Sequence, residues 1–234
     1  MTLQGITGLD PAKIQVISSL EGQIIDAEKF LTIAEDIVKS VPGCLLIIDS
    51  ASALCAGAER IADITSQTRN QGPKLMASFC RKLGNVVPVN RSIVWIIQHF
   101  MANTSGYGSP FMEDGGNKIV YQGDVKIRSK GFSDWKDGTQ IIGQQIKWDI
   151  EFSALGPPGG VVESFLRYGE GIDEIWEWSQ MGIEMGIIEA SGAWFSMASL
   201  GVEKKLNGQK NVCLKLKEDP KLLEELKKKI KELM

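Results

Sequence analysis

The sequence predicts an α/β fold: a mostly parallel sheet with helices on both faces and an antiparallel extension, followed by a small C-terminal α/β domain. Residues 44–48 are apolar throughout and end on Asp49, as parallel strands buried on both faces do. Strand and helix patterns alternate through residues 14–98, which is typical of βαβ units. After residue 124 the pattern becomes β-rich, and after residue 172 it changes to short amphipathic helices.

The first elements follow from local signals. Residues 14–18 form a short apolar run suited to a strand. Asp26 is typical of a helix N-cap, and Pro42 with Gly43 ends the helix that follows. The apolar positions of this helix are spaced to share one face: Phe30, Ala34, Ile37 and Val38.

A second helix and strand come next. Residues 71–87 have amphipathic helical spacing, and residues 92–98 form an apolar run that ends on Gln98. Polar stretches at 59–70 and 99–117 leave the sheet at the end where ligands bind in α/β folds. The Gly, Ser and Asn content of 99–117 predicts a long loop without regular structure.

The second half of the sequence is predicted to form the antiparallel extension of the sheet and the small C-terminal domain. Three β-rich runs, at 124–130, 141–152 and 161–168, are separated by turn residues and indicate the antiparallel extension. We expect a boundary near residue 172, which gives domains of 1–171 and 172–234. The last helix is predicted to begin at Asp219 and Pro220, an N-cap followed by proline at the first helical position.

Composition excludes some classes of function. The 234 residues carry a net charge of −3, so nucleic-acid binding would have to come from local patches. The four cysteines are scattered without a C-x-x-C pair, and three of them sit among apolar neighbours, which favours small core residues in a reducing compartment. No charged and then apolar leader and no membrane-length run is present, and we therefore expect a cytoplasmic protein without membrane contact.

Asp49, Ser50 and Gln98 are the candidate residues for a nucleotide site. A carboxylate at the tip of a parallel strand can hold Mg²⁺ through water, and Ser50 follows it directly. Gln98 ends the neighbouring strand and could sense a γ-phosphate and move the loop after it. The alternative is that Asp49 merely caps its strand. No G-x-x-x-x-G-K-[ST] phosphate loop precedes Asp49.

Basic and aromatic residues are the candidates for binding single-stranded DNA. Arg60, Arg69 and Lys74 lie in a segment with few acids, and would face the phosphates. Tyr107 and Phe111 in the second polar stretch could stack on bases without sequence preference. The alternatives are a solvated charged face and a surface loop with no partner.

These pieces, in this order, resemble the RecA family of recombinases. Residues 45–54 resemble the family's Walker B strand, and residues 96–98 its strand ending in an allosteric glutamine. The family's two DNA-binding loops would fall at 59–72 and around the G-x-P and G-G-N elements at 108–117. Two further signatures match at Tyr168–Ile172 and Gly192–Ser196.

The resemblance implies roles for these residues. Asp49 would hold Mg²⁺ through water and, with Ser50, contact ATP, while Gln98 would report the nucleotide state to the second loop. Gly115 and Gly116 would join the DNA-binding residues named above. The implied partners are single-stranded DNA and either a separate Walker A-bearing RecA-like chain or other copies in a filament.

Departures from the family pattern leave two hypotheses. The family's Walker A loop and hydrolytic glutamate precede the point where this chain starts. Phe152, Ser153 and Ala154 stand where two lysines that reach a neighbour's ATP are expected, and His99 and Phe100 replace a basic residue. The chain is either the Walker B part of a split recombinase, an ATPase only when complemented, or a non-hydrolysing paralogue that regulates a complete recombinase. An inactive fragment is a third alternative.

Overall fold

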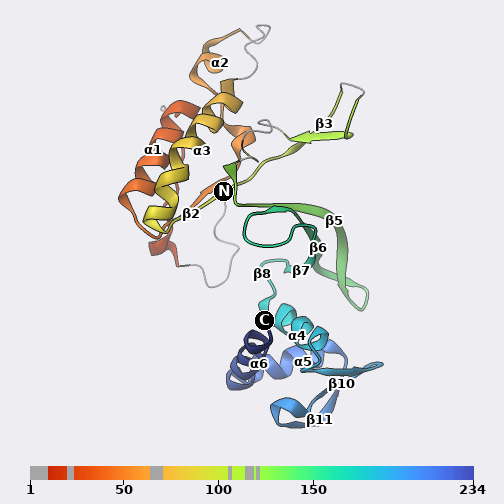
Figure 1. Ribbon diagram of the computed structural model, residues 1–234. Helices are drawn as coiled ribbons and strands as arrows, with labels where there is room; N and C mark the ends of the chain where they lie inside the picture. Colours follow the sequence, from red (N-terminus) through yellow and green to blue (C-terminus); the bar gives the residue numbers. More distant parts are fainter. Residues whose placement is uncertain (1–9, 20–23, 64–70, 105–106, 114–118, 120–121) are drawn as a thin grey trace. The chain divides into compact units, whose positions relative to one another are not determined.

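The computed structural model describes residues 10–19, 24–63, 71–104, 107–113, 119 and 122–234 (Figure 1). The chain divides into two compact units, an N-terminal unit of Ile14–Lys126 and a C-terminal unit of Ile127–Met234 together with Met1–Lys13. The domain boundary near residue 172 stays a prediction. The one described element of the short N-terminal piece is a 3₁₀ turn, η2 (Pro11–Lys13).

The N-terminal unit is built around two long helices. Its elements are α1 (Ala27–Ser40), β1 (Leu45–Ile48), η3 (Ala51–Ala53), α2 (Gly57–Ile61), α3 (Gln71–Asn90), β2 (Ile93–Ile96), β3 (Phe100–Ala102) and β4 (Phe111–Glu113). The predicted N-cap is confirmed, because the Asp26 carboxylate accepts a hydrogen bond from the Lys29 amide at 3.0 Å. Such a cap stabilises a helix by about 1 kcal/mol.

β1 and β2 form a parallel pair in which Leu45 lies beside Ile93 and Ile48 beside Ile96. Alternate side chains of both strands, among them Ile48 and Val94, pack into a core with α1 and α3. Figure 1 shows these two helices lying along each other. The intervening side chains of β1 and β2 are exposed. In the described part of the chain, helices therefore cover only one face of this pair, whereas the sequence predicted helices on both faces.

α3 continues to Asn90, three residues beyond its predicted end and through Pro88. The Asn90 side chain explains this length, because its Nδ2 donates to the carbonyl oxygens of Val38 at 2.7 Å and Lys39 at 3.2 Å. These bonds also satisfy carbonyls that α1 leaves unpaired at its C-terminal end.

Two predictions for the N-terminal unit are wrong. Residues 14–18 form no strand; most of them are exposed, and no described strand pairs with them. The stretch 99–117 contains regular structure, since β3 and β4 pair as an antiparallel hairpin. The Asn103 side chain makes this possible: its Nδ2 donates to the carbonyls of Tyr107 and Ser109, both at 2.8 Å, and so closes the connection between the strands.

The C-terminal unit begins with the predicted antiparallel sheet. β5 (Val125–Asp137), β6 (Gln140–Ser153), β7 (Val161–Arg167) and β8 (Gly171–Ile172) lie in that order. The division between the two units falls inside β5. Ion pairs link the strands: Arg128 contacts Glu151 at 3.2 Å and Lys147 contacts Glu163 at 3.2 Å.

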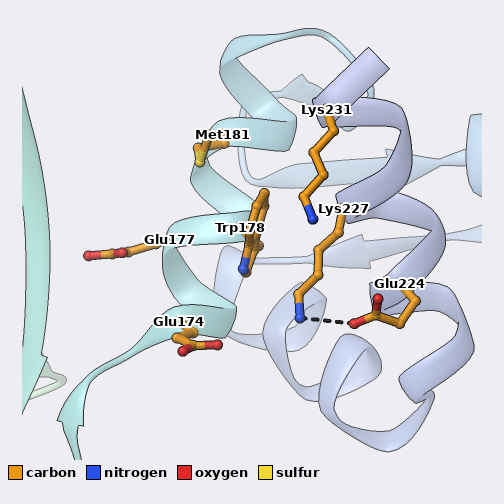
Figure 2. Close-up of a pocket in the computed structure, with 7 residues that line it drawn as sticks. All are labelled: Glu174, Glu177, Trp178, Met181, Glu224, Lys227 and Lys231. Carbon is orange, nitrogen blue, oxygen red and sulfur yellow. Dashed lines mark hydrogen bonds and ion pairs between the residues drawn. The ribbon is translucent and has the colours of Figure 1, made fainter. Parts of the chain in front are cut away.

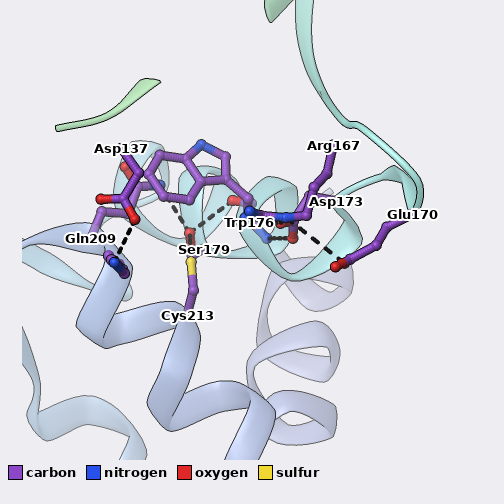
Figure 3. Close-up of polar contacts among 9 residues, drawn as sticks. Asp137, Arg167, Glu170, Asp173, Trp176, Ser179, Gln209 and Cys213 are labelled. Carbon is purple, nitrogen blue, oxygen red and sulfur yellow. Dashed lines mark hydrogen bonds and ion pairs between the residues drawn. The ribbon is translucent and has the colours of Figure 1, made fainter. Parts of the chain in front are cut away.

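An arginine and an aromatic cluster join this sheet to the first helix after it, α4 (Glu174–Glu184). Arg167 donates through Nε and Nη2 to Asp173 Oδ2, at 3.0 and 2.8 Å, and lies 4.4 Å from the ring centroid of Trp135. Asp173 Oδ1 accepts from the Trp176 amide and so caps α4 (Figure 3). Trp135, Phe165 and Trp176 are mutually in edge or tilted contact, with centroids 5.1–5.4 Å apart.

The rest of the C-terminal unit has its own hydrophobic core. Its remaining elements are β9 (Glu189–Ser191), β10 (Trp194–Met197), η5 (Ala198–Leu200), β11 (Val202–Asn207), α5 (Gln209–Glu218) and α6 (Pro220–Leu233). The predicted start of the last helix is confirmed, because Asp219 Oδ1 accepts from the amides of Lys221 and Leu222. Every buried core residue of this part lies between Ile187 and Ile230.

The α/β class, with mixed sheets and a small C-terminal α/β part, is confirmed. Antiparallel pairs outnumber the single parallel pair among the described strands. Among the described residues, no helix is both long and apolar enough to cross a membrane.

Candidate functional site

Asp49 and Gln98 lie where two paired parallel strands end. The backbone holds these ends together, since the Ile97 amide donates to the Ile48 carbonyl at 3.0 Å and the Ala51 amide to the Ile97 carbonyl at 2.9 Å. Asp49 follows β1 directly and is exposed, while Gln98 is half-buried two residues beyond β2. The predicted juxtaposition of the two strand ends is therefore present.

The residues after Asp49 tie the two strand ends further. The peptide bond between Asp49 and Ser50 is cis. Ser50 is buried, with 6% of its surface exposed, and Ser52 Oγ accepts a hydrogen bond from the His99 amide at 3.2 Å. Ser52 was not among the predicted residues. Its bond connects the segment after β1 to the residue that follows Gln98.

The edge formed by the ends of β1 and β2 suits Mg²⁺ only as a hydrated ion that takes further ligands from a nucleotide. Mg²⁺ takes oxygen ligands, keeps several waters and is often bound by one or two carboxylates plus phosphates. Within the described residues, no group of three or more His, Cys, Asp or Glu side chains is placed to hold a metal ion. A single exposed carboxylate at Asp49 suits a hydrated ion whose other ligands come from a nucleotide.

The β3–β4 hairpin carries the two predicted aromatic residues. Tyr107 is 89% exposed beyond the end of β3, and Phe111 is exposed on β4 opposite Ala102. The Asn103 bonds fix the backbone at Tyr107 and at Ser109, two residues further on. Asn103 was missed in the sequence, although an Asn close after a short apolar run and followed by Gly and Ser is typical of a turn.

Glu113 at the base of the hairpin forms an ion pair with Lys126. Its second carboxylate oxygen is buried without a hydrogen-bond partner in the described structure. The pair fastens the end of β4 to the start of β5, so that the hairpin is anchored at its base and closed near its tip.

The predicted basic residues are divided among separate elements. Arg60 is exposed on α2, and Lys74 is exposed in the first turn of α3. Neither forms an ion pair with another residue that the structure describes. Arg69, Gly115 and Gly116 lie outside the described residues, so their predicted roles stay predictions.

A pocket of about 390 Å³ lies between α4 and α6 in the C-terminal unit (Figure 2). Lys227 Nζ lies 5.8 Å from the ring centroid of Trp178 and pairs with Glu224 at 2.9 Å. None of the predicted site residues lines this pocket. It therefore adds nothing to the site at the strand ends.

Family models match nearly the whole chain. The model of the RecA N-terminal domain matches residues 12–173, and that of the RecA C-terminal domain matches residues 179–234. Both matches follow the chain order that the sequence motifs indicated.

Curated relatives agree with the family models. The chain is 34% identical to a RecA protein of Sulfurovum sp. over 209 residues, which is 88% of this chain and 59% of that protein. It is 32% identical to that of Sulfurimonas denitrificans (94% and 64%) and 29% identical to that of Chlorobaculum tepidum (94% and 63%). The chain thus spans about 60% of the length of these relatives.

Proposed function

Because the chain belongs to the RecA family, we propose that it acts in homologous recombination and DNA repair as the part of a recombinase that carries the Walker B strand. The observation that carries the proposal is the shared end of β1 and β2, where Asp49 and Gln98 follow two hydrogen-bonded parallel strands. In α/β sheets this edge is where nucleotides bind.

We assign to these residues only some of the groups that an ATP site needs. Asp49 holds hydrated Mg²⁺ beside the phosphates of ATP and, with Ser50, contacts the nucleotide. Ser52 holds the backbone of this edge in place. Gln98 connects the edge to the β3–β4 hairpin, which begins two residues later. The phosphate-gripping loop comes from a Walker A-bearing RecA-like segment outside these 234 residues, and the two parts act together in a filament.

The DNA role is assigned to the β3–β4 hairpin with Arg60, Arg69 and Lys74. Exposed aromatic rings on a closed hairpin stack on unpaired bases, and a hairpin held by Asn103 loses little conformational freedom on binding. The basic side chains contact phosphates, which makes the affinity depend on salt.

Complementation tests the nucleotide role. We expect ATP hydrolysis when the chain is mixed with a Walker A-bearing RecA segment and poly(dT), and none when any component is left out. Asp49→Asn should lower the rate at least 100-fold, because an amide cannot replace the carboxylate charge near Mg²⁺. The control is Asp36→Asn on the exposed side of α1, which should leave the rate unchanged.

The same experiment separates this proposal from the regulatory alternative. Phe152, Ser153 and Ala154 favour that alternative, because none of them can supply a cation to a neighbouring nucleotide. If the mixture hydrolyses no ATP, and Asp49→Asn leaves the effect of the chain on a complete recombinase unchanged, the regulatory alternative replaces the proposal.

Fluorescence anisotropy with labelled oligo(dT) tests the DNA role. Removing one stacked ring costs about 1–3 kcal/mol, so Tyr107→Ala and Phe111→Ala should each weaken binding roughly tenfold. Tyr168→Ala removes a similarly exposed ring outside the hairpin and should leave the affinity unchanged. Equal affinities for all three variants would contradict the role of the hairpin.

A further inference from the structure

Met101 and Met112 are direct neighbours across the β3–β4 hairpin. They form the middle one of the three residue pairs that join its strands. Residues opposite each other in antiparallel strands have Cβ atoms about 5 Å apart and project from the same face of the sheet. The two thioethers therefore lie side by side, on the face of the hairpin opposite to Phe111.

Solvent reaches both of these methionines. Met101 is 43% exposed and Met112 is 48% exposed, and neither belongs to a hydrophobic core cluster of the described residues. Met76 and Met197, in contrast, are 2% and 0% exposed. The methionines of the cores are thus shielded from reagents in solution, whereas the hairpin pair is open to them.

The contact between Met101 and Met112 is important because the hairpin is small. β3 and β4 are three residues long each and form a two-stranded sheet. Two-stranded hairpins are marginally stable in water, and apolar pairs across the strands are a main source of their stability. A chemical change at the middle pair therefore acts on the element as a whole.

Peroxides change methionine in a defined way. The thioether sulfur attacks one oxygen of hydrogen peroxide, so that an S–O bond forms and the O–O bond breaks. The proton of the transferred hydroxyl passes to the departing hydroxide, which gives a sulfoxide and one molecule of water. The sulfur loses the two electrons that the peroxide gains. The sulfoxide is polar, and methionine sulfoxide reductases convert it back to the thioether.

We propose that Met101 and Met112 form a reversible oxidation site, at which peroxide converts the paired thioethers to sulfoxides and so loosens the β3–β4 hairpin. Two neighbouring sulfoxides are hydrated and lose their apolar contact, so the strands separate more readily. The consequence for DNA rests on the proposed function, in which this hairpin stacks on bases. A loosened hairpin must be ordered again on binding, which lowers its affinity.

Peptide mass spectrometry of the folded chain after graded exposure to hydrogen peroxide locates the modification. We expect Met101 and Met112 to be oxidised roughly tenfold faster than Met76 and Met197, because solvent reaches only the first two. Equal rates at all four residues would overturn the assignment of the site.

Hydrogen exchange of the backbone amides at 100–103 and 111–113 tests the loosening without DNA. Oxidation should speed exchange roughly fivefold in the wild type, and methionine sulfoxide reductases should restore the slow rate. The double variant Met101→Leu, Met112→Leu keeps two apolar side chains of similar volume that peroxide does not oxidise, so its exchange should stay unchanged. Met185→Leu replaces a methionine that is 37% exposed directly after α4, and this control should respond as the wild type does.

Two results of this exchange experiment would contradict the proposal. One is an oxidised wild type whose exchange is as slow as before. The other is a double variant whose exchange is accelerated as much as that of the wild type.

Fluorescence anisotropy with labelled oligo(dT) measures the consequence for DNA, with each protein compared to its own unoxidised form. Dithiothreitol first reverses disulfides and sulfenic acids at cysteines such as the exposed Cys55, and leaves sulfoxides in place. Oxidation should weaken binding roughly fivefold in the wild type and less than twofold in the double variant, because only the wild type loses its middle apolar pair.

The exchange and binding measurements together separate this inference from the proposed function. Exchange that responds to oxidation, in a chain whose unoxidised form does not bind oligo(dT), supports the oxidation site and contradicts the DNA role of the hairpin. Binding that is unaffected when Met101 and Met112 are both fully oxidised overturns the inference and leaves the DNA role intact.

Discussion

Ser179 is a fully buried hydroxyl that joins α4 to α5 (Figure 3). It donates to the Trp176 carbonyl at 2.8 Å, accepts from Gln209 Nε2 at 2.9 Å, and lies 3.4 Å from the Cys213 sulfur. A buried hydroxyl without partners would cost about 1–3 kcal/mol, so these contacts explain why a serine is tolerated at this position. The same hydroxyl is a neighbour of the Cys213 thiol.

Burial raises the pKa of the Cys213 thiol to about 11, from a usual value of 9.0. The folded chain keeps this proton while the unfolded chain loses it near pH 9. The stabilising effect of the neutral thiol is therefore complete below pH 9 and is lost as the pH rises toward 11.

Urea unfolding of the wild type and of Cys213→Ala at pH 8 and pH 10 tests this effect. Between these pH values we expect the free energy of unfolding to fall by about 1 kcal/mol more in the wild type than in the variant. Lysines and tyrosines titrate in both proteins and cancel in the comparison. An equal fall would show that the thiol ionises alike in the folded and unfolded chains.

At the scale of elements, Gly143 determines how closely β6 approaches β7. A Cβ at this position would collide with the Leu166 carbonyl oxygen and lie 3.0 Å from the Trp135 ring. Gly84 in α3 is the opposite case, since a Cβ there has no neighbour within 4 Å. The two glycines form a matched pair in a strand and in a helix.

We expect Gly143→Ala to destabilise the chain by about 2 kcal/mol, because the strands must separate to admit the methyl group. Gly84→Ala should stabilise it by about 0.5–1 kcal/mol, because alanine restricts the unfolded chain and favours the helix. Thermal unfolding followed by circular dichroism measures both. A neutral Gly143→Ala variant would show that β6 and β7 are further apart than described.

Elements with local signals could be predicted from the sequence. Asp26 and Asp219 cap helices as expected, because the capping bond needs only residues two or three positions ahead. The β3–β4 hairpin was not predicted, because its strands are only three residues long and part of its closure comes from the Asn103 side chain. The exposure of alternate residues in β1 could not be predicted either, because an apolar run is the same in sequence whether helices cover one face of the strand or both.

In the candidate site, too, some features follow from the local sequence and others depend on contacts between distant residues. The shared edge of Asp49 and Gln98 follows from the rule that parallel strands end together, so the sequence was enough. Ser52 was missed because its bond to the His99 amide joins residues 47 positions apart. No local pattern contains such a contact.

At the scale of the whole molecule, the C-terminal core is formed by a continuous piece of chain. Its buried residues lie between Ile187 and Ile230, and partly buried Ile175 and Trp178 pack against them. We therefore expect a fragment of residues 172–234 to fold alone, with a helical circular dichroism spectrum and a cooperative thermal transition. A disordered spectrum would contradict the boundary at residue 172. Removing Trp135 and Phe165, which contact Trp176, should make the fragment less stable than the same region in the full chain.

The pairing of β1 with β2 has a consequence for how the chain folds. Leu45 and Ile93 are neighbours in the sheet but 48 residues apart in sequence, so a long segment must close before the parallel pair is gained. The C-terminal core closes through much shorter loops, and contacts of that kind form faster. When the full chain refolds, the C-terminal core is therefore expected to reach its final packing before β1 and β2 pair. During that interval their apolar residues are open to chaperones and to aggregation.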